Sequence, residues 1–268
     1  VGLSFAFLFI SDVRTEPPAA TGGRVPPAAV RYTLRFVGLV GWLWIVVQGI
    51  AGGSGTGDVA TLFLWVYGWV GLAMLSAFVG PVWHWLDPFA TLHDIAAAVL
   101  RRLGVAGWPL AELPPSLQRW PAVVGLCFFV WLELVGNALG TRALFVSLLG
   151  YTAFTLAMMA QFGRDEWRRD GETFGVWFGL LGRLAPFALV GDPHEGRVAR
   201  RGFATGLLLP GWRVVDVVLV GIGTASILFD GISQTRPWAD LLGIADVAGR
   251  TAQLFVFMGL LVLAALAV

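Results

Sequence analysis

The chain has 268 residues, of which 57% are hydrophobic and 13% charged, and its mean hydropathy is +0.77. A soluble protein of this size would lack the polar surface needed to cover its core, so the composition excludes a soluble fold. The net charge of +1 provides no basic patch for nucleic acid, and we expect no nucleic-acid partner.

Apolar runs that are long enough to cross a membrane recur along the whole chain. Each is close to the ~20 residues that a helix needs to span a ~30 Å hydrocarbon core. A shorter apolar stretch, residues 1–10, begins without Met or a basic flank, and we interpret it as the second half of a further span. The sequence therefore predicts an all-α transmembrane bundle of about seven spans, the first of them truncated, in a single domain over residues 1–268. The six complete runs are residues 36–53, 59–80, 120–137, 143–162, 214–230 and 248–268.

Two connecting segments predict additional helices at the membrane surface. Asp87 is a suitable N-cap for a helix that begins with Pro88. The apolar residues that follow it repeat at helical spacing up to Leu103, which favours an interfacial helix. Residues 171–190 are apolar but interrupted by glycines and by Arg183. We expect an interfacial or re-entrant helix there that ends near Pro186.

The basic residues predict the orientation of the chain. All eighteen are arginines, and fifteen of them fall in segments that alternate spans place on one side. The positive-inside rule assigns that side to the cytoplasm, so the amino end is expected outside and the carboxyl end inside. Many tryptophans, Trp83 among them, stand near the ends of spans and are expected to anchor the protein among membrane lipids. Asp216 lies one turn from Arg213, so a local ion pair is expected there.

Four ionisable residues lie in or beside the spans on the predicted outer side: Glu133, Asp230, Asp246 and Arg250. Such groups are costly inside a membrane and are therefore candidates for function. One interpretation is structural, with Asp246 and Arg250 neutralising each other one turn apart and Asp230 capping a helix. The other interpretation brings Glu133 and Asp230 together across the bundle. These carboxylates, with Asn137 one turn beyond Glu133 in support, would bind a divalent metal or act as a general base.

Other cofactors and catalytic groups have little support in the sequence. A b-type haem is not expected, because none of the three histidines lies deep in a span. The single Cys127 cannot hold an iron–sulfur cluster. No set of nucleophile and base falls in one compartment.

Several segments occur here in a familiar order. They are Trp85-Leu86-Asp87-Pro88-Phe89, Trp120-Pro121-Ala122 through Trp131-Leu132-Glu133-Leu134, Gly171-Glu172-Thr173-Phe174-Gly175 through Arg183-Leu184-Ala185-Pro186, and Phe229-Asp230-Gly231-Ile232-Ser233. In this order the chain resembles bacterial multi-pass membrane proteins of the fenitrothion hydrolase-like family, over most of its length. The resemblance implies a bacterial inner-membrane protein that cleaves an organophosphate ester, with two different membrane subunits acting together. Glu133 and Asp230 are the matching residues to examine first.

Three functions follow as alternatives. The first is a non-catalytic or accessory subunit of a larger membrane complex, because the chain shows no redox site or nucleophile set and residues 171–190 offer apolar surface to other subunits. The second is the organophosphate-ester hydrolase implied by the resemblance, with water activated at Glu133 and Asp230. The third is a small-solute transporter, which has less support because the chain shows no inverted repeat of broken helices.

Overall fold

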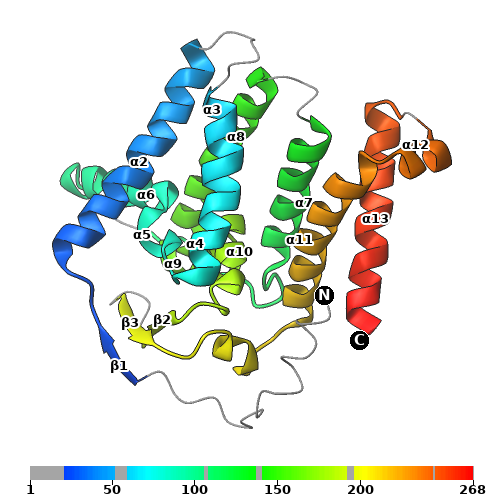
Figure 1. The fold of residues 1–268 in the computed structure, drawn as a ribbon. Helices are drawn as coiled ribbons and strands as arrows, with labels where there is room; N and C mark the ends of the chain where they lie inside the picture. Colours follow the sequence, from blue (N-terminus) through cyan, green and yellow to red (C-terminus); the bar gives the residue numbers. More distant parts are fainter. Residues whose placement is uncertain are drawn as a thin grey trace.

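A computed structural model describes residues 21–51, 59–105, 108–136, 141–191, 196–243 and 245–267. This part of the chain is mostly helical (Figure 1). In chain order its helices are α2 (Ala28–Ala51), α3 (Val59–Leu62), the π-helix η1 (Phe63–Gly71), α4 (Leu72–Phe78), α5 (Trp83–Leu86), α6 (Pro88–Arg102), α7 (Trp120–Leu134), α8 (Thr141–Phe162), α9 (Arg164–Asp170), α10 (Thr173–Leu181), the 3₁₀ helix η3 (Thr205–Leu208), α11 (Val214–Ser233), α12 (Arg236–Leu242) and α13 (Val247–Ala267).

Five helical segments in the described residues are long and apolar enough to cross a membrane: α2, the continuous α3–η1–α4, α8, α11 and α13. Helix α7, in the predicted run 120–137, is also apolar but has only 15 residues. Figure 1 shows these six segments running alternately up and down, as the predicted order of spans requires. The mostly helical architecture is thus confirmed, with five described segments long enough to cross a membrane where about seven spans are predicted. The truncated first span, predicted at residues 1–10, lies outside the described residues.

Helix α2 begins earlier than the apolar run predicts, at Ala28 rather than at residue 36. Its first turns contain Arg31 and Arg35, and charged residues usually end a span. The Arg35 guanidinium lies 3.0 Å from the carboxylate of Asp94 on α6, which also pairs with Arg164 at 2.7 Å. These ion pairs provide a partner for Arg35 at the helix end, so the backbone helix continues through it.

A small antiparallel sheet departs from the all-α prediction. Its strands are β1 (Thr21–Arg24), β2 (Phe187–Val190) and β3 (Arg197–Arg200), in the order β1-β3-β2. Figure 1 places them at the end of the bundle where α11 begins. The helix that the sequence predicts within residues 171–190, ending near Pro186, is therefore shorter than expected, and strand β2 was not predicted. Helix α10 ends at Leu181, before Pro186, and the residues after Pro186 satisfy their backbone by pairing with β3.

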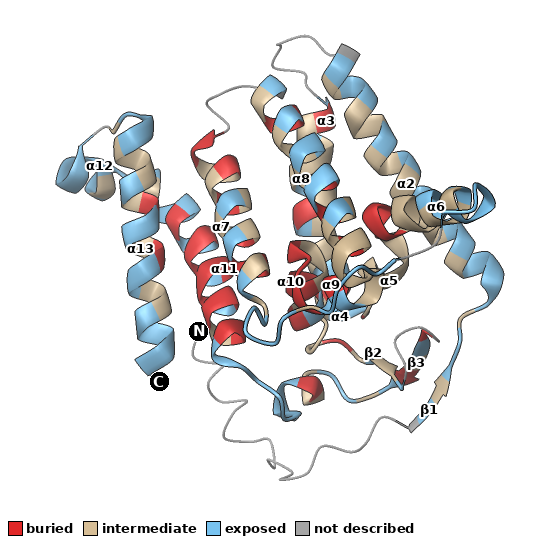
Figure 2. Cartoon of the chain, turned by 180° about the vertical axis from the view of Figure 1, so that it is seen from behind, coloured by how far each residue is buried: buried red, intermediate tan, exposed pale blue. Residues whose placement is uncertain are grey.

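The first half of that segment, α10, is packed inside the chain's own bundle. Figure 2 shows α10, α11 and parts of α7 as mostly buried, whereas α2 and α13 are largely exposed. Val176, Trp177, Phe178 and Leu180 of α10 are all buried and belong to the main core with residues of α7 and α11. These side chains of α10, part of the apolar surface that the sequence analysis offers to other subunits, are thus covered by this chain.

The helix predicted to begin at Pro88 is confirmed as α6, and part of its apolar stripe is exposed. The Asp87 carboxylate caps it, accepting hydrogen bonds from the backbone N–H groups of Phe89 and Ala90 at 2.9 and 3.1 Å. Ile95 and Val99 are each 50% exposed. This exposure is what a helix lying in the membrane interface requires.

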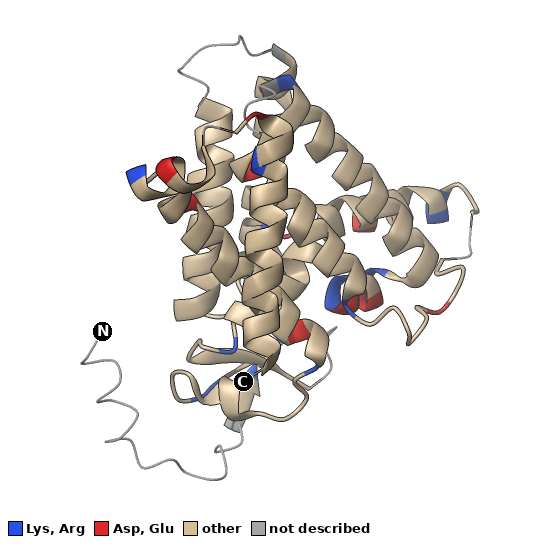
Figure 3. Cartoon of the chain, turned by 90° about the vertical axis from the view of Figure 1, so that its right-hand side faces the viewer, with Lys and Arg blue, Asp and Glu red and all other residues tan. Residues whose placement is uncertain are grey.

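Charged residues gather at helix ends and in the connecting segments, and the long helices contain few along their length (Figure 3). At the start of α11 the fully buried Asp216 lies 2.6 Å from the Arg119 guanidinium. Arg213 donates only its backbone N–H to Asp216, and its guanidinium pairs with Asp170 at 3.0 Å. The predicted side-chain pair between Asp216 and Arg213 is therefore wrong, because Asp216 caps α11 and takes its charge partner from the segment before α7. This network joins the ends of α7, α9 and α11.

Candidate functional site

A cavity of about 250 Å³ lies among α2, η1, α7, α8 and the start of α10. Its wall is almost wholly apolar and includes Trp42, Phe63, Phe129, Leu132 and Leu148. We refer to this cavity as the apolar chamber. Most ligand pockets are likewise apolar, with a few polar groups that fix orientation.

The polar end of the chamber is formed by Tyr151 of α8, whose ring lines the cavity. Its hydroxyl donates a hydrogen bond to the carboxylate of Glu172 and accepts one from the backbone N–H of Thr173 at 3.1 Å. Gly125 of α7 faces this point, where a Cβ would lie 2.0 Å from the Thr173 hydroxyl oxygen. The missing side chain lets α7 approach closely enough to close this side of the chamber.

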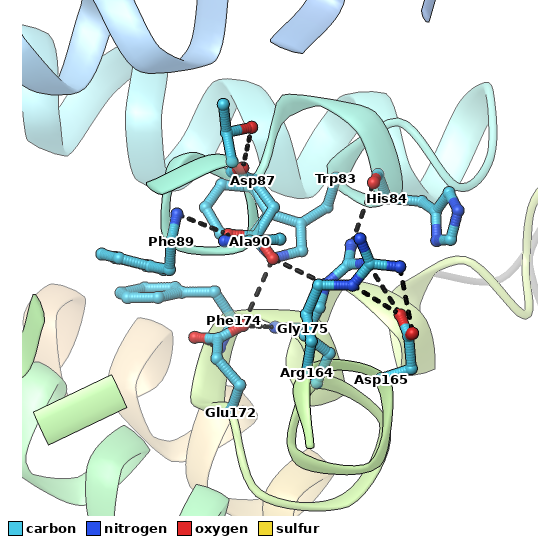
Figure 4. A network of polar contacts seen from close by, with 12 residues as sticks. Trp83, His84, Asp87, Phe89, Ala90, Arg164, Asp165, Glu172, Phe174 and Gly175 are labelled. Atoms are coloured by element: carbon cyan, nitrogen blue, oxygen red, sulfur yellow. Dashed lines mark hydrogen bonds and ion pairs between the residues drawn. The ribbon is translucent and has the colours of Figure 1, made fainter. Parts of the chain in front are cut away.

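Glu172 occupies its position because it caps α10. Its carboxylate accepts hydrogen bonds from the backbone N–H groups of Phe174 and Gly175, at the positive end of the helix (Figure 4). The indole Nε1 of Trp83 donates a further hydrogen bond at 3.3 Å. With Tyr151, four donors converge on a side chain that is only 1% exposed. The helix cap, the tryptophan and the tyrosine together hold the carboxylate beside the chamber.

A second buried carboxylate, Asp87, lies near Glu172 but differs from it in having a cationic partner. Arg168 places its Nε 2.7 Å from Asp87 and also donates to the backbone oxygen of His84 at 2.9 Å. Asp87 and Arg168 are 1% and 9% exposed. The negative charge of Asp87 is thus balanced by Arg168, whereas no cation lies within 4.0 Å of Glu172 in the described part of the chain.

This difference changes the acidity of Glu172. Burial, together with the negative charge of Asp87, raises the pKa of Glu172 to about 7. Both protonation states are therefore populated near neutral pH. As a carboxylate it accepts from all four donors, and as an acid it has the Tyr151 oxygen as a neighbouring acceptor. The arrangement can exchange a proton with a molecule in the chamber through the Tyr151 hydroxyl.

The structure places Glu133 on α7 and Asp230 on α11, at the opposite end of the bundle from the small sheet. The two carboxylates are close enough to interact electrostatically. Asp230 is exposed and accepts a hydrogen bond from Gln234 at 2.9 Å. No three Asp, Glu, His or Cys side chains come together as metal ligands in the described residues. A shared proton or divalent metal at Glu133 and Asp230 stays a prediction.

The supporting residues of that predicted site have separate roles. Asp246 caps α13 by accepting from the backbone N–H of Gly249 at 2.8 Å. Among the described residues it forms no ion pair within 4.0 Å with Arg250, because its carboxylate faces the open N–H groups of the helix start. The Nε of Arg250 is buried without a hydrogen-bond partner in this same part of the chain. Asn137 lies outside the described residues.

Sequence reasoning missed Tyr151, which lines the chamber, and Glu172, to which the Tyr151 hydroxyl donates. Glu172 belongs to one of the segments that carry the family resemblance. The signal that could have identified it is its position as a carboxylate directly before an apolar helix, where it can cap the helix. Tyr151 is one of only three tyrosines and lies in the middle of an apolar run. Trp83, expected to be a lipid anchor, instead packs against the rings of Phe89 and Phe174 and donates to Glu172.

No family model matches the chain, and no curated protein or solved structure shows significant similarity to it. The resemblance to fenitrothion hydrolase-like proteins stays a prediction, and the function must be argued from the geometry.

Proposed function

We propose that this chain is an integral membrane protein that binds a neutral, lipid-soluble small molecule in the apolar chamber and exchanges a proton with it through Tyr151 and Glu172. The observation that carries the proposal is the position of this hydrogen-bonded pair at the end of an otherwise apolar cavity. Five helices long and apolar enough to cross a membrane support the location in a bilayer.

The chamber wall favours a particular class of ligand. Its side chains are apolar or aromatic apart from the hydroxyl residues Ser147 and Thr173, and neither a carboxylate nor a basic group is among them. A charged ligand would lose its hydration there without gaining a partner, so the ligand should be uncharged. Tyr151 provides the hydrogen-bonding group, which favours a ligand with one polar function, such as a phenol or an ester. A volume of about 250 Å³ suits a molecule about the size of one substituted aromatic ring.

An esterase reaction on such a ligand is the second candidate, and the acidity of Glu172 favours it. A carboxyl group with a pKa of about 7 is suited to general acid–base chemistry at neutral pH. In this reaction Glu172, acting through the Tyr151 hydroxyl, takes a proton from the attacking water as the water oxygen bonds to the ester, and returns it to the leaving-group oxygen as its ester bond breaks. This agrees with the class of reaction that the resemblance implies but assigns the base to Glu172 in place of Glu133 and Asp230.

The accessory-subunit hypothesis loses one of its two supporting arguments. It depended in part on residues 171–190 offering apolar surface to a partner, and α10 is covered by this chain's own α4, α7 and α9. Membership of a complex stays a prediction.

Binding to the chamber is tested with the protein in phosphatidylcholine nanodiscs and 4-tert-butylphenol as the probe, measured by calorimetry. Leu148→Trp should abolish binding, because Leu148 lines the chamber. Leu149→Trp is the matched control, since Leu149 is 38% exposed on the same helix. Tyr151→Phe should weaken binding by roughly 5–10-fold, the effect of one lost hydrogen bond. Unchanged binding by Leu148→Trp would refute the proposal.

The esterase candidate needs a separate readout. 4-Nitrophenyl diethyl phosphate is added to the same nanodiscs, and release of nitrophenolate is followed. Glu172→Gln should remove activity while leaving phenol binding within a few fold. If activity survives in Glu172→Gln but is lost in Glu133→Gln, the predicted site at Glu133 and Asp230 is favoured instead.

A further inference from the structure

A second cavity, of about 310 Å³, lies between α4, α5, α9, α10 and β2, on the side that the arginines assign to the cytoplasm. Trp83 lines both this cavity and the apolar chamber. The two differ in chemistry, because Arg168, Arg169, Arg183 and Arg201 all line the second cavity. We call it the arginine pocket.

The four arginines differ in how their charges are balanced. Arg168 pairs with Asp87 at 2.7 Å, and Arg169 pairs with two neighbouring carboxylates of α9. Asp165, which also lines the pocket, lies 3.7 Å from Arg168. Arg183 and Arg201 have no carboxylate within 4.0 Å in the part of the chain that the structure describes. The pocket therefore has an excess of positive charge that its own residues do not neutralise.

The contacts of Arg183 and Arg201 hold these side chains in place without supplying negative charge. Arg183 stacks on the ring of Trp212 at 4.2 Å. Arg201 donates to the backbone oxygens of Ala185 and Gly182 just after α10. Burial lowers the pKa of Arg183, and burial with the nearby charge of Arg183 lowers the pKa of Arg201. A bound anion would relieve this repulsion.

Buried hydrogen-bond donors in the pocket also lack partners among the described residues. Ser76 of α4 lines the pocket and is 1% exposed, yet its hydroxyl oxygen makes no hydrogen bond there. One terminal nitrogen of Arg183 is likewise buried and without a partner. Unsatisfied buried polar groups are costly, and an oxyanion has the acceptors to satisfy them.

Three glycines of α10 and its C-cap, Gly175, Gly179 and Gly182, also line the pocket. A Cβ at Gly179 would meet no atom within 4 Å, so this position opens into free space. His84 also lines the pocket, but burial and the charge of Arg168 lower the pKa of His84 to about 3. It is neutral at physiological pH, so the arginines alone provide the positive charge.

We infer that the arginine pocket binds a phosphate group, held by the guanidinium groups of Arg183 and Arg201 and by the Ser76 hydroxyl. Phosphate has the charge and the several acceptor oxygens that this set of donors requires. A lipid headgroup and free cytoplasmic phosphate both carry such a group. Both could reach the pocket, because it lies at the end of α4, where a span meets the interface. The inference is independent of the ligand proposed for the apolar chamber.

The test measures thermal unfolding of the whole protein in nanodiscs of phosphatidylcholine alone or with 30% phosphatidylglycerol, with inorganic phosphate titrated at constant ionic strength. Stabilisation by inorganic phosphate in the phosphatidylcholine discs identifies free phosphate. Stabilisation by phosphatidylglycerol with no added effect of inorganic phosphate identifies the lipid headgroup.

Gly179→Leu fills the pocket and should reduce phosphate affinity at least tenfold. The matched control is Gly150→Leu on α8, where a Cβ also meets no atom within 4 Å. Arg183→Gln should give the same loss without filling the pocket, and Arg101→Gln on the exposed end of α6 should give none. The inference is overturned if neither phosphate source stabilises the protein, or if Gly179→Leu and Arg183→Gln respond like their controls.

Discussion

The substitution Glu172→Gln should remove a pH dependence of stability that the structure builds into the polar end of the chamber. The pKa of Glu172 is raised from 4.5 to about 7 by burial and by Asp87. Because ionisation is harder in the folded state, the native protein holds its proton to higher pH than the unfolded chain. The contribution of Glu172 to the free energy of unfolding is largest below pH 4.5, falls as the pH rises, and levels off above pH 7.

The difference between the two pKa values is about 2.5 units, which corresponds to about 3 kcal/mol in all at 1.36 kcal/mol per unit. Between pH 5 and pH 8 the free energy of unfolding should fall by about 2–3 kcal/mol because of this group. The glutamine side chain introduced by Glu172→Gln keeps one acceptor oxygen but cannot ionise. The pKa of His84 is lowered to about 3, so the contribution of His84 to stability rises with pH below pH 6.5, opposite to that of Glu172. It is present in both proteins, so its effect cancels in their difference.

The assay is reversible unfolding in mixed micelles at several pH values, and the quantity to plot is the stability of the native protein minus that of Glu172→Gln. This difference should fall by about 2–3 kcal/mol from pH 5 to pH 8. Glu112→Gln, at an exposed residue, is the control and should leave a flat difference. A flat difference for Glu172→Gln as well would refute the assignment of Glu172 as the group that titrates near pH 7.

Three further predictions concern the fold. Arg119→Met should destabilise the protein by roughly 3–5 kcal/mol in thermal unfolding, because it leaves the fully buried Asp216 without its partner; an effect below about 1 kcal/mol would contradict this. Gly38→Ala should lower the melting temperature, since its Cβ would lie 1.7 Å from the Leu86 oxygen, whereas Gly150→Ala should not. In a chain whose Cys127 is replaced by Ala, a cysteine placed within residues 54–57 should react with an impermeant thiol reagent from outside the cell and one within residues 196–201 should not. Reversed labelling would overturn the predicted orientation.

The sequence by itself determined the helical architecture, because bilayer crossing imposes length and hydropathy on each segment separately. The start of α6 was predictable for the same local reason. Asp87 followed by Pro88 is a helix start whatever surrounds it, and the structure shows the expected cap. The boundary of α2 was not predictable. It depends on Asp94 of another helix, which gives Arg35 a partner.

Only the tertiary structure decided which polar residues share a site. Tyr151 and Glu172 come from different helices, and nothing in the local pattern around either residue signals the hydrogen bond between them. The acidity of Glu172 likewise depends on its burial and on Asp87, which is distant in sequence. In residues 171–190 the composition showed that apolar surface had to be covered but could not show by what. Packing decided that α10 enters this chain's own core, because burial is a property of all the surrounding helices and not of the segment itself.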